Sequence, residues 1–178
     1  MVKIKNNVIA LIGMTGCGKT SVGRILAKKS DAVFIDLDDE IVIRHGEIKK
    51  IFAEQGEEAF RKLEYATLKA LIGEADGRLT VLSCGGGLPT FSGSRELLCA
   101  EASVVWLRRS PESVLKDEGV LMRPPVNGDP ANYKRLLDAR YPIYRSCADY
   151  SFYNAFPQRT ARSIIKKLQL NTNTEGKK

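Results

Sequence analysis

The chain has 178 residues, 43% of them hydrophobic, which predicts one domain, 1–170, and a polar tail, 171–178, that we expect to be disordered. No apolar stretch approaches the roughly 20 residues of a membrane-spanning helix, and the cysteines are scattered without a CxxC pair, so we expect a cytoplasmic protein with no membrane partner. The net charge of +7 favours anionic ligands, but the basic residues form no stripe interleaved with aromatics, and we expect no nucleic-acid partner.

Short apolar runs alternate with longer amphipathic segments along the chain. In chain order, we predict strands at 7–12, 32–35, 79–83, 103–107 and 149–153, and helices at 19–29, 39–45, 48–72, 94–100, 111–117, 131–146 and 157–169. Most strand segments are continuous apolar runs, typical of strands covered on both faces, and their alternation with helices indicates an α/β fold with a parallel sheet. The segment 116–130 contains three prolines and two glycines, so we expect a lid over about 111–130.

The segment 13–21, GMTGCGKTS, lies between the first predicted strand and the first predicted helix. It matches the P-loop pattern G-x-x-x-x-G-K-[ST], whose glycines let backbone N–H groups turn inward toward a phosphate at the positive end of the helix dipole. Lys19 would reach the β- and γ-phosphates, and the Thr20 hydroxyl would ligate Mg²⁺. We interpret Cys17 as a small filler residue. The ATP contacts expected from this segment are Gly13, Gly16, Cys17, Gly18, Lys19, Thr20 and Ser21.

Two carboxylates follow the second predicted strand, in the sequence IDLDDE. Asp36 and Asp38 are two residues apart, so on a strand they would share a face and point into the crevice beside the P-loop. One would hold a metal-bound water, and the other would receive an acceptor hydroxyl. The alternative is that Asp38 or Asp39 caps the following helix, and this stretch alone does not decide between the two.

Arginines and glycines complete a candidate anion site. Arg61 lies on the predicted helix 48–72, Arg140 on the helix 131–146 and Arg123 in the predicted lid. Glycines 85–87 follow the third strand, where they would let a ligand approach bare backbone. Each arginine alone is more often a partner in a surface salt bridge. In combination with the P-loop and the aspartates, they indicate phosphoryl transfer to a carboxylated acceptor.

The order of these motifs resembles the shikimate kinase family. The matching segments span about residues 7–165 and read GMTGCGKTSVGRILAK, FIDLDDEI, IFAEQGEEAFRKLE, VLSCGGG, VVWL, RPP and ARYPIYRSCAD. The resemblance implies a three-layer P-loop kinase fold, with a five-stranded parallel sheet in the order 2-3-1-4-5 and a mobile lid. It also implies Mg²⁺-dependent transfer of the ATP γ-phosphate to the 3-hydroxyl of shikimate, on the route to chorismate. We expect a monomer.

By position, the resemblance assigns a role to each candidate residue. Asp38 would bind the acceptor hydroxyls and act as the base, or assist it. Lys19 would hold the phosphates, and Arg123 would move with the lid to meet the transferred phosphoryl group. Asp36 would support, through water, the Mg²⁺ bound by Thr20. ATP contacts outside the P-loop would be Lys116, Arg123 and Arg159. Shikimate would contact Asp38, Gly85, Gly86 and Gly87, with Arg61 and Arg140 gripping its carboxylate.

The chain departs from the family pattern in three places. The segment GEIKKIF (46–52) is one residue shorter than usual and lacks a serine, which could tilt the acceptor-side helix. Pro125 stands where leucine is usual, and Lys116 replaces an arginine that often stacks on adenine. Two rival functions stay open: a P-loop kinase for another small hydroxylated acceptor, such as gluconate or a nucleoside, and a nucleotide-binding module without catalysis. The paired arginines count against the first, and the presence of all three catalytic candidates counts against the second.

Overall fold

One parallel sheet forms the centre of the protein. The computed structural model describes residues 2–121, 126 and 128–172. The five strands stand in the order β2-β3-β1-β4-β5, as the resemblance implies, and each neighbouring pair is parallel. The bounds of the strands are β1 Val8–Ile12, β2 Val33–Asp36, β3 Thr80–Ser83, β4 Ser103–Arg108 and β5 Tyr150–Tyr153.

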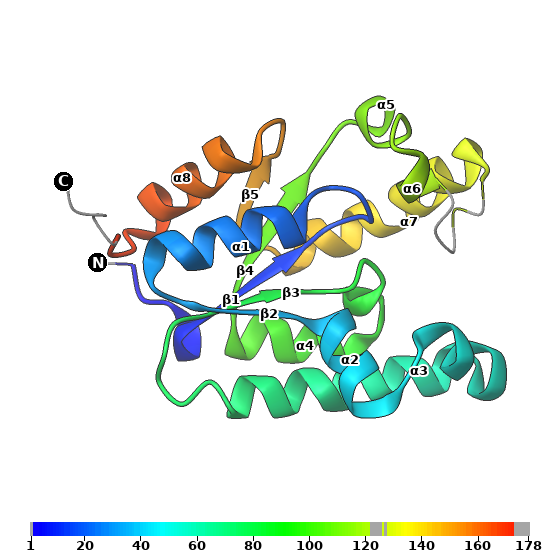
Figure 1. Cartoon of the computed structure of the whole chain (residues 1–178), viewed down its shortest axis with the longest axis horizontal. Coiled ribbons are helices and arrows are strands. Elements are labelled where there is room, and N and C mark those ends of the chain that lie inside the picture. The colour runs from blue at the N-terminus through cyan, green and yellow to red at the C-terminus, as the bar shows by residue number, and fades with distance from the viewer. Residues whose placement is uncertain (1, 122–125, 127, 173–178) are drawn as a thin grey trace.

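Helices cover both faces of this sheet (Figure 1). Helices α1 and α8 pack on one face, and α3, α4 and α7 pack on the other. Within the described ranges, no helix is both long and apolar enough to cross a membrane. The helix bounds are α1 Lys19–Ser30, α2 Leu37–His45, α3 Ile48–Gly73, α4 Ser92–Glu101, α5 Pro111–Val114, α6 Glu118–Leu121, α7 Pro130–Cys147 and α8 Pro157–Leu168, with 3-10 turns at Lys5–Asn7 and Leu88–Thr90.

Strand β1 lies at the centre of the sheet, and its side chains alternate between the two hydrophobic layers. Ile9 and Leu11 pack with the layer of α1 and α8, whereas Val8, Ala10 and Ile12 pack with the opposite layer. All five are fully buried. A strand covered on both faces needs apolar residues at every position, which explains the continuous apolar run.

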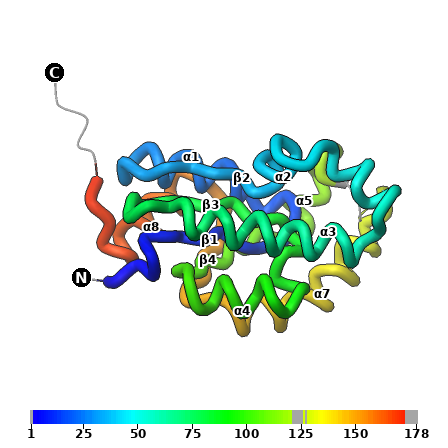
Figure 2. The backbone as a smooth tube through the Cα atoms, turned by 90° about the horizontal axis from the view of Figure 1, so that it is seen from below, coloured from blue at the N-terminus to red at the C-terminus, as the bar shows by residue number. Residues whose placement is uncertain are grey.

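The parallel arrangement places the candidate site residues at one edge of the sheet. The P-loop follows β1, Asp36 ends β2, and glycines 85–87 follow β3, so all three segments leave the carboxyl ends of neighbouring strands. Helix α2 and the beginning of α3 lie at the opposite end of the molecule from the N-terminus and the end of α8 (Figure 2).

Three helix predictions need correction, the first two of them at α2 and α5. The helix predicted from residue 39 begins at Leu37, because the Asp36 side chain caps it by accepting a hydrogen bond from the Asp38 N–H at 3.2 Å. The helix predicted at 111–117 ends at Val114 and is followed by the separate helix α6. Val114 and Val120 both pack against Gly16, whereas on one continuous helix they would point about 120° apart. The chain therefore turns between them.

The predicted helix 48–72 is also not continuous. Gly56 has φ 79° and ψ 174°, so it breaks α3 into a first arm, 48–55, and a second arm, 57–73, which carries Arg61. The rings of Phe52 and Phe60 pack across the break with their centroids 4.4 Å apart. The short segment 46–52 therefore lies before the break, and Arg61 lies after it.

Candidate active site

The P-loop has the left-handed backbone conformations that its glycines predict. Gly13, Gly16 and Gly18 have φ of 139°, 76° and 91°. A Cβ atom on Gly16 would also lie 2.6 Å from Val114, and one on Gly13 would overlap the carbonyl of Leu107. Both conformation and close packing therefore require glycine at these positions.

Lys19 begins α1 and is nearly buried, with 9% of its surface exposed. Its Nζ donates hydrogen bonds to the carbonyl oxygens of Gly13 at 2.9 Å and Met14 at 3.0 Å. The ammonium group is thus held at the mouth of the loop, beside the positive end of the α1 dipole. This combination of amide dipoles and a buried cation favours a phosphate anion.

Cys17 and Ser21 differ in their access to this loop. The Cys17 side chain is 1% exposed, and its carbonyl oxygen accepts a hydrogen bond from Asn154 Nδ2 at 2.8 Å. Ser21 is exposed on the first turn of α1. The position of Cys17 agrees with its interpretation as a filler residue, and its thiol is packed inside the loop.

Oxygen donors for a divalent cation meet beside the P-loop. The Thr20 hydroxyl donates a hydrogen bond to Asp36 Oδ2 at 2.8 Å and lies 3.4 Å from the Ser83 hydroxyl. Among the described residues, no group of three or more His, Cys, Asp or Glu side chains could hold a metal. A hydroxyl and one carboxylate fit Mg²⁺, which retains waters and takes its remaining ligands from substrate phosphates.

A cavity of about 720 Å³ opens beside the P-loop, between α3, α7 and the loop after β3. Thr15 of the P-loop lines it, so the cavity adjoins the phosphate site. The structure brings all six predicted acceptor-side residues to its walls. They are Asp38, Arg61, Gly85, Gly86, Gly87 and Arg140.

Asp38 reaches this cavity from the first turn of α2, and not from strand β2 as the two-residue spacing suggested. The strand ends at Asp36, whose side chain forms the cap. A Cβ on Gly85 would lie 2.9 Å from Asp38 Oδ1 and 2.9 Å from Glu64 Oε1. Gly85 therefore lies between two carboxylates, and its missing side chain leaves room for both.

Arg61 is fixed by two carboxylates on its own helix. It forms an ion pair with Glu64 and a second with Glu57 at 3.0 Å, while its Nε is buried without a hydrogen-bond partner. A side chain on Gly87 would overlap the guanidinium. Burial raises the pKa of Glu64 to about 7, although the neighbouring Arg61 opposes this shift. Sequence reasoning missed Glu64.

Glu64→Gln should remove a pH dependence of stability. The folded protein retains the Glu64 proton up to about pH 7, whereas the ordinary pKa is 4.5, so rising pH lowers the free energy of unfolding across this window. The difference between wild type and Glu64→Gln should change by up to about 3 kcal/mol between those limits and stay flat above them. Urea denaturation at a series of pH values measures it.

The control for that experiment is Glu58→Gln. Glu58 lies on the same arm of α3 but is exposed and pairs with Lys62. Because Lys62 lowers the pKa of Glu58, the Glu58 substitution should leave the pH profile between pH 4.5 and 7 close to that of wild type. Parallel profiles for wild type and Glu64→Gln would contradict the assignment of the raised pKa to Glu64.

Helix α7 contributes Arg140 and supports the glycine loop. The Tyr144 hydroxyl donates a hydrogen bond to the Gly86 carbonyl oxygen at 2.6 Å. Burial raises the pKa of Tyr144 well above its usual value, so this hydroxyl stays protonated and remains a donor. Tyr144 lies one helical turn after Arg140, and it therefore ties the arginine-bearing helix to the glycine loop.

Sequence reasoning missed three residues that contact the P-loop or lie in the segment after β5. Arg109 donates a hydrogen bond to the Gly16 carbonyl oxygen at 3.2 Å. The buried Asn154 joins the P-loop to α8, because it donates a hydrogen bond to the Cys17 carbonyl oxygen and accepts one from the Thr160 hydroxyl at 2.9 Å. Phe156 is 59% exposed just before α8. Asn154 and Phe156 could have been noticed in the sequence because they closely follow strand β5.

The remaining predicted nucleotide contacts lie outside the P-loop. Arg159 is exposed on α8, and its guanidinium carbon lies 5.1 Å from the centre of the Phe156 ring. Lys116 is exposed between α5 and α6. Arg123 and Pro125 lie outside the described residues.

Fold and site together define the class of the protein. A P-loop between β1 and α1, on a five-stranded parallel sheet and beside a cavity lined by arginines and a carboxylate, is the arrangement of a P-loop kinase. The family model for shikimate kinase matches residues 15–169. The chain belongs to the shikimate kinase family and is a kinase, a phosphoryl-transferring enzyme.

Individual relatives cover most of the chain. The shikimate kinase of Neisseria gonorrhoeae is 36% identical over 167 residues, 92% of this chain and 96% of the relative. The shikimate kinase of Mycobacterium avium is 41% identical over 141 residues, 78% of each chain. The solved structure of shikimate kinase from Acinetobacter baumannii in complex with shikimate has a TM-score of 0.81 at 32% identity and covers 91% of this chain and 92% of that one.

Proposed function

We propose that the chain transfers the γ-phosphoryl group of ATP to the 3-hydroxyl of shikimate, giving shikimate 3-phosphate and ADP. The observation that supports this most directly is that Asp38, Arg61 and Arg140 line one cavity next to the P-loop. Shikimate has a carboxylate and ring hydroxyls, so it matches two guanidinium groups and a carboxylate. The Acinetobacter relative, which contains shikimate, supports the same choice.

The donor binds through the P-loop amides and Lys19. These groups offer positive charge at the position where the β- and γ-phosphates develop more negative charge during transfer. Phe156 and Arg159 form an exposed aromatic and cationic surface at the end of β5, and Asn154 ties this segment to the P-loop. We assign the adenine contact to that surface.

On the acceptor side, Arg61 and Arg140 bind the carboxylate and thereby orient the ring. Asp38 accepts a hydrogen bond from the reacting hydroxyl and receives its proton as the oxygen bonds to phosphorus and the bond to ADP breaks. Glu64 holds the Arg61 fork in place, since it is buried beside it. Positioning is the main contribution, because phosphoryl transfer requires little covalent help from the protein.

The metal, the lid arginine, the oligomeric state and the location complete the proposal. Thr20 and Asp36 would hold Mg²⁺, and the bound ion would neutralise phosphate charge. Arg123 meets the transferred group by analogy with the family. We also propose a monomer in the cytoplasm; scattered cysteines without a CxxC pair favour a reducing compartment.

A coupled ADP-release assay tests this function. We expect ATP turnover with shikimate as acceptor, and only background turnover with gluconate or nucleoside monophosphates. Mass spectrometry of the product should show one added phosphoryl group. Turnover with an acceptor that lacks a carboxylate, and none with shikimate, would overturn the substrate assignment and favour the rival kinase. No turnover with any acceptor, combined with normal ATP binding, would favour a silent nucleotide-binding module.

A further inference from the structure

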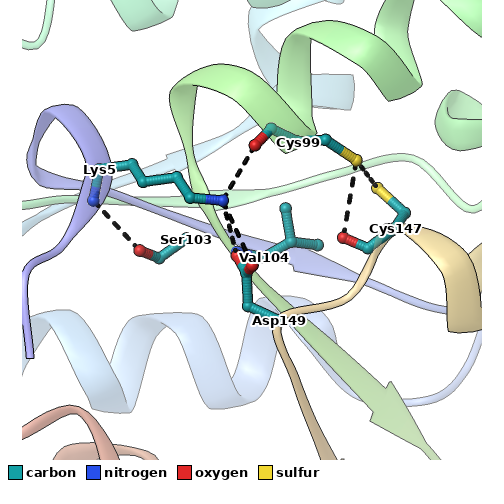
Figure 3. Close-up of polar contacts among 6 residues, drawn as sticks. All are labelled: Lys5, Cys99, Ser103, Val104, Cys147 and Asp149. Carbon is teal, nitrogen blue, oxygen red and sulfur yellow. Dashed lines mark hydrogen bonds and ion pairs between the residues drawn. The ribbon is translucent and has the colours of Figure 1, made fainter.

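Two cysteines from distant parts of the chain meet at the end of the molecule away from the P-loop. Cys99 lies in the last turn of α4, and Cys147 is the final residue of α7. They are 48 residues apart in sequence, yet their sulfur atoms are 3.4 Å apart (Figure 3). The Cys99 thiol also donates to the carbonyl oxygen of Cys147 at 3.8 Å. No CxxC spacing signals this pair in the sequence.

A polar network holds the two helix ends together. Lys5 Nζ donates to the carbonyl oxygen of Cys99 at 2.9 Å and to Asp149 Oδ1 at 3.2 Å. Asp149 follows α7 closely and accepts a hydrogen bond from the Val104 N–H at 2.8 Å. Lys5 therefore joins the end of α4 to the segment after α7, as Figure 3 shows. The approach of the two sulfurs is thus built into the fold.

The two thiols differ in their access to solvent. Cys99 is partly exposed, whereas Cys147 is 4% exposed. Burial, together with the neighbouring Cys99, raises the pKa of Cys147 to about 12. Cys147 is therefore shielded from reagents in solution, and its nearest available partner is the sulfur of Cys99.

We propose that Cys99 and Cys147 form a dithiol–disulfide pair that is oxidised by small disulfides. The Cys99 thiolate attacks one sulfur of the small disulfide, forming a mixed disulfide and releasing one small thiol. The Cys147 sulfur then attacks the Cys99 sulfur, and its proton passes to the departing sulfur, which leaves as the second small thiol. Two protein thiols are thereby oxidised to one disulfide, while the small disulfide is reduced to two thiols.

The geometry makes the second step a short movement. A disulfide bond is about 2.05 Å long, so the sulfurs must approach each other by a little over 1 Å, which small side-chain rotations can supply. The bond would close residues 99–147 into one covalent loop that contains β4 and α7. It would thereby restrict the unfolded chain and raise the melting temperature by about 5–10 °C.

The experiment uses the full chain incubated with glutathione disulfide. Wild type should lose two hydrogens in intact mass, yield a Cys99–Cys147 peptide and melt at a higher temperature, and dithiothreitol should reverse all three changes. Cys84→Ser, which removes a different buried thiol, should behave like wild type. Cys99→Ser should form no intramolecular disulfide, and Cys147→Ser should stop at the mixed disulfide on Cys99.

Two outcomes would overturn the proposal. One is wild-type protein that keeps its reduced mass or carries only mixed disulfides after the incubation. The other is a disulfide that maps to Cys17 or Cys84 instead. If Cys147→Ser folds poorly, the Cys99→Ser variant still decides the question, because its altered side chain is partly exposed.

Discussion

Asp38→Asn should lower kcat by at least about 100-fold while the Kd for ATP stays close to that of wild type. Asparagine has nearly the same shape and can still hold the acceptor hydroxyl, but it cannot take the proton. Asp38 is well placed for this role, since it lines the acceptor cavity and flanks Gly85. Steady-state turnover with shikimate and an independent measurement of nucleotide binding give the two quantities.

Asp39→Asn provides the matched control. Asp39 is the next residue in the same first turn of α2, is exposed and is not among the residues that line the cavity. Its substitution removes the same charge from the helix N-terminus, where it costs only about 0.3–1 kcal/mol. Comparable losses of turnover in both variants, or near-normal turnover in Asp38→Asn, would refute the role of Asp38 as base.

Arg140→Ala should raise the KM for shikimate by at least about 30-fold and change the KM for ATP much less. In the bound complex, the substitution removes a cationic partner of the shikimate carboxylate, which has been withdrawn from water. Arg140 is a cleaner test than Arg61, because Arg61 is also bound to the buried Glu64 and to Glu57, and its removal would disturb folding as well as binding. Initial rates at varied concentrations of each substrate separate the two effects.

Two further variants serve as comparisons for Arg140→Ala. Arg140→Lys keeps the charge but loses the two-pronged guanidinium, so it should fall between wild type and Arg140→Ala. Arg145→Ala removes an exposed cation from the same helix and should leave both KM values unchanged. If Arg140→Ala weakens ATP and shikimate equally, the arginine does not act on the acceptor carboxylate.

The sheet could be predicted from sequence because burial on both faces leaves a strong local signal. Each predicted strand agrees with the structure to within a residue at either end. The P-loop could be predicted equally well, because its chemistry depends on consecutive residues. The acceptor-side residues gather at one cavity because the parallel order brings the ends of β1, β2 and β3 together.

What could not be predicted depends on contacts between distant segments. Glu64 stands three residues after Arg61 and reads as half of an ordinary helical ion pair, yet the glycine loop after β3 buries it. Asn154 is informative only once β5 is known to end beside the P-loop. The break at Gly56 was overlooked because a single glycine is tolerated inside a helical pattern.

The break in α3 at Gly56 divides the residues of this helix that line the acceptor cavity between two arms. The wall that carries Phe52 belongs to the first arm, 48–55, whereas Arg61 belongs to the second arm, 57–73. We therefore expect a substitution in the first arm to change the wall near Phe52 and to leave Arg61 in place. The break thus separates the residues that shape this wall from the arginine of α3 that would bind the acceptor carboxylate.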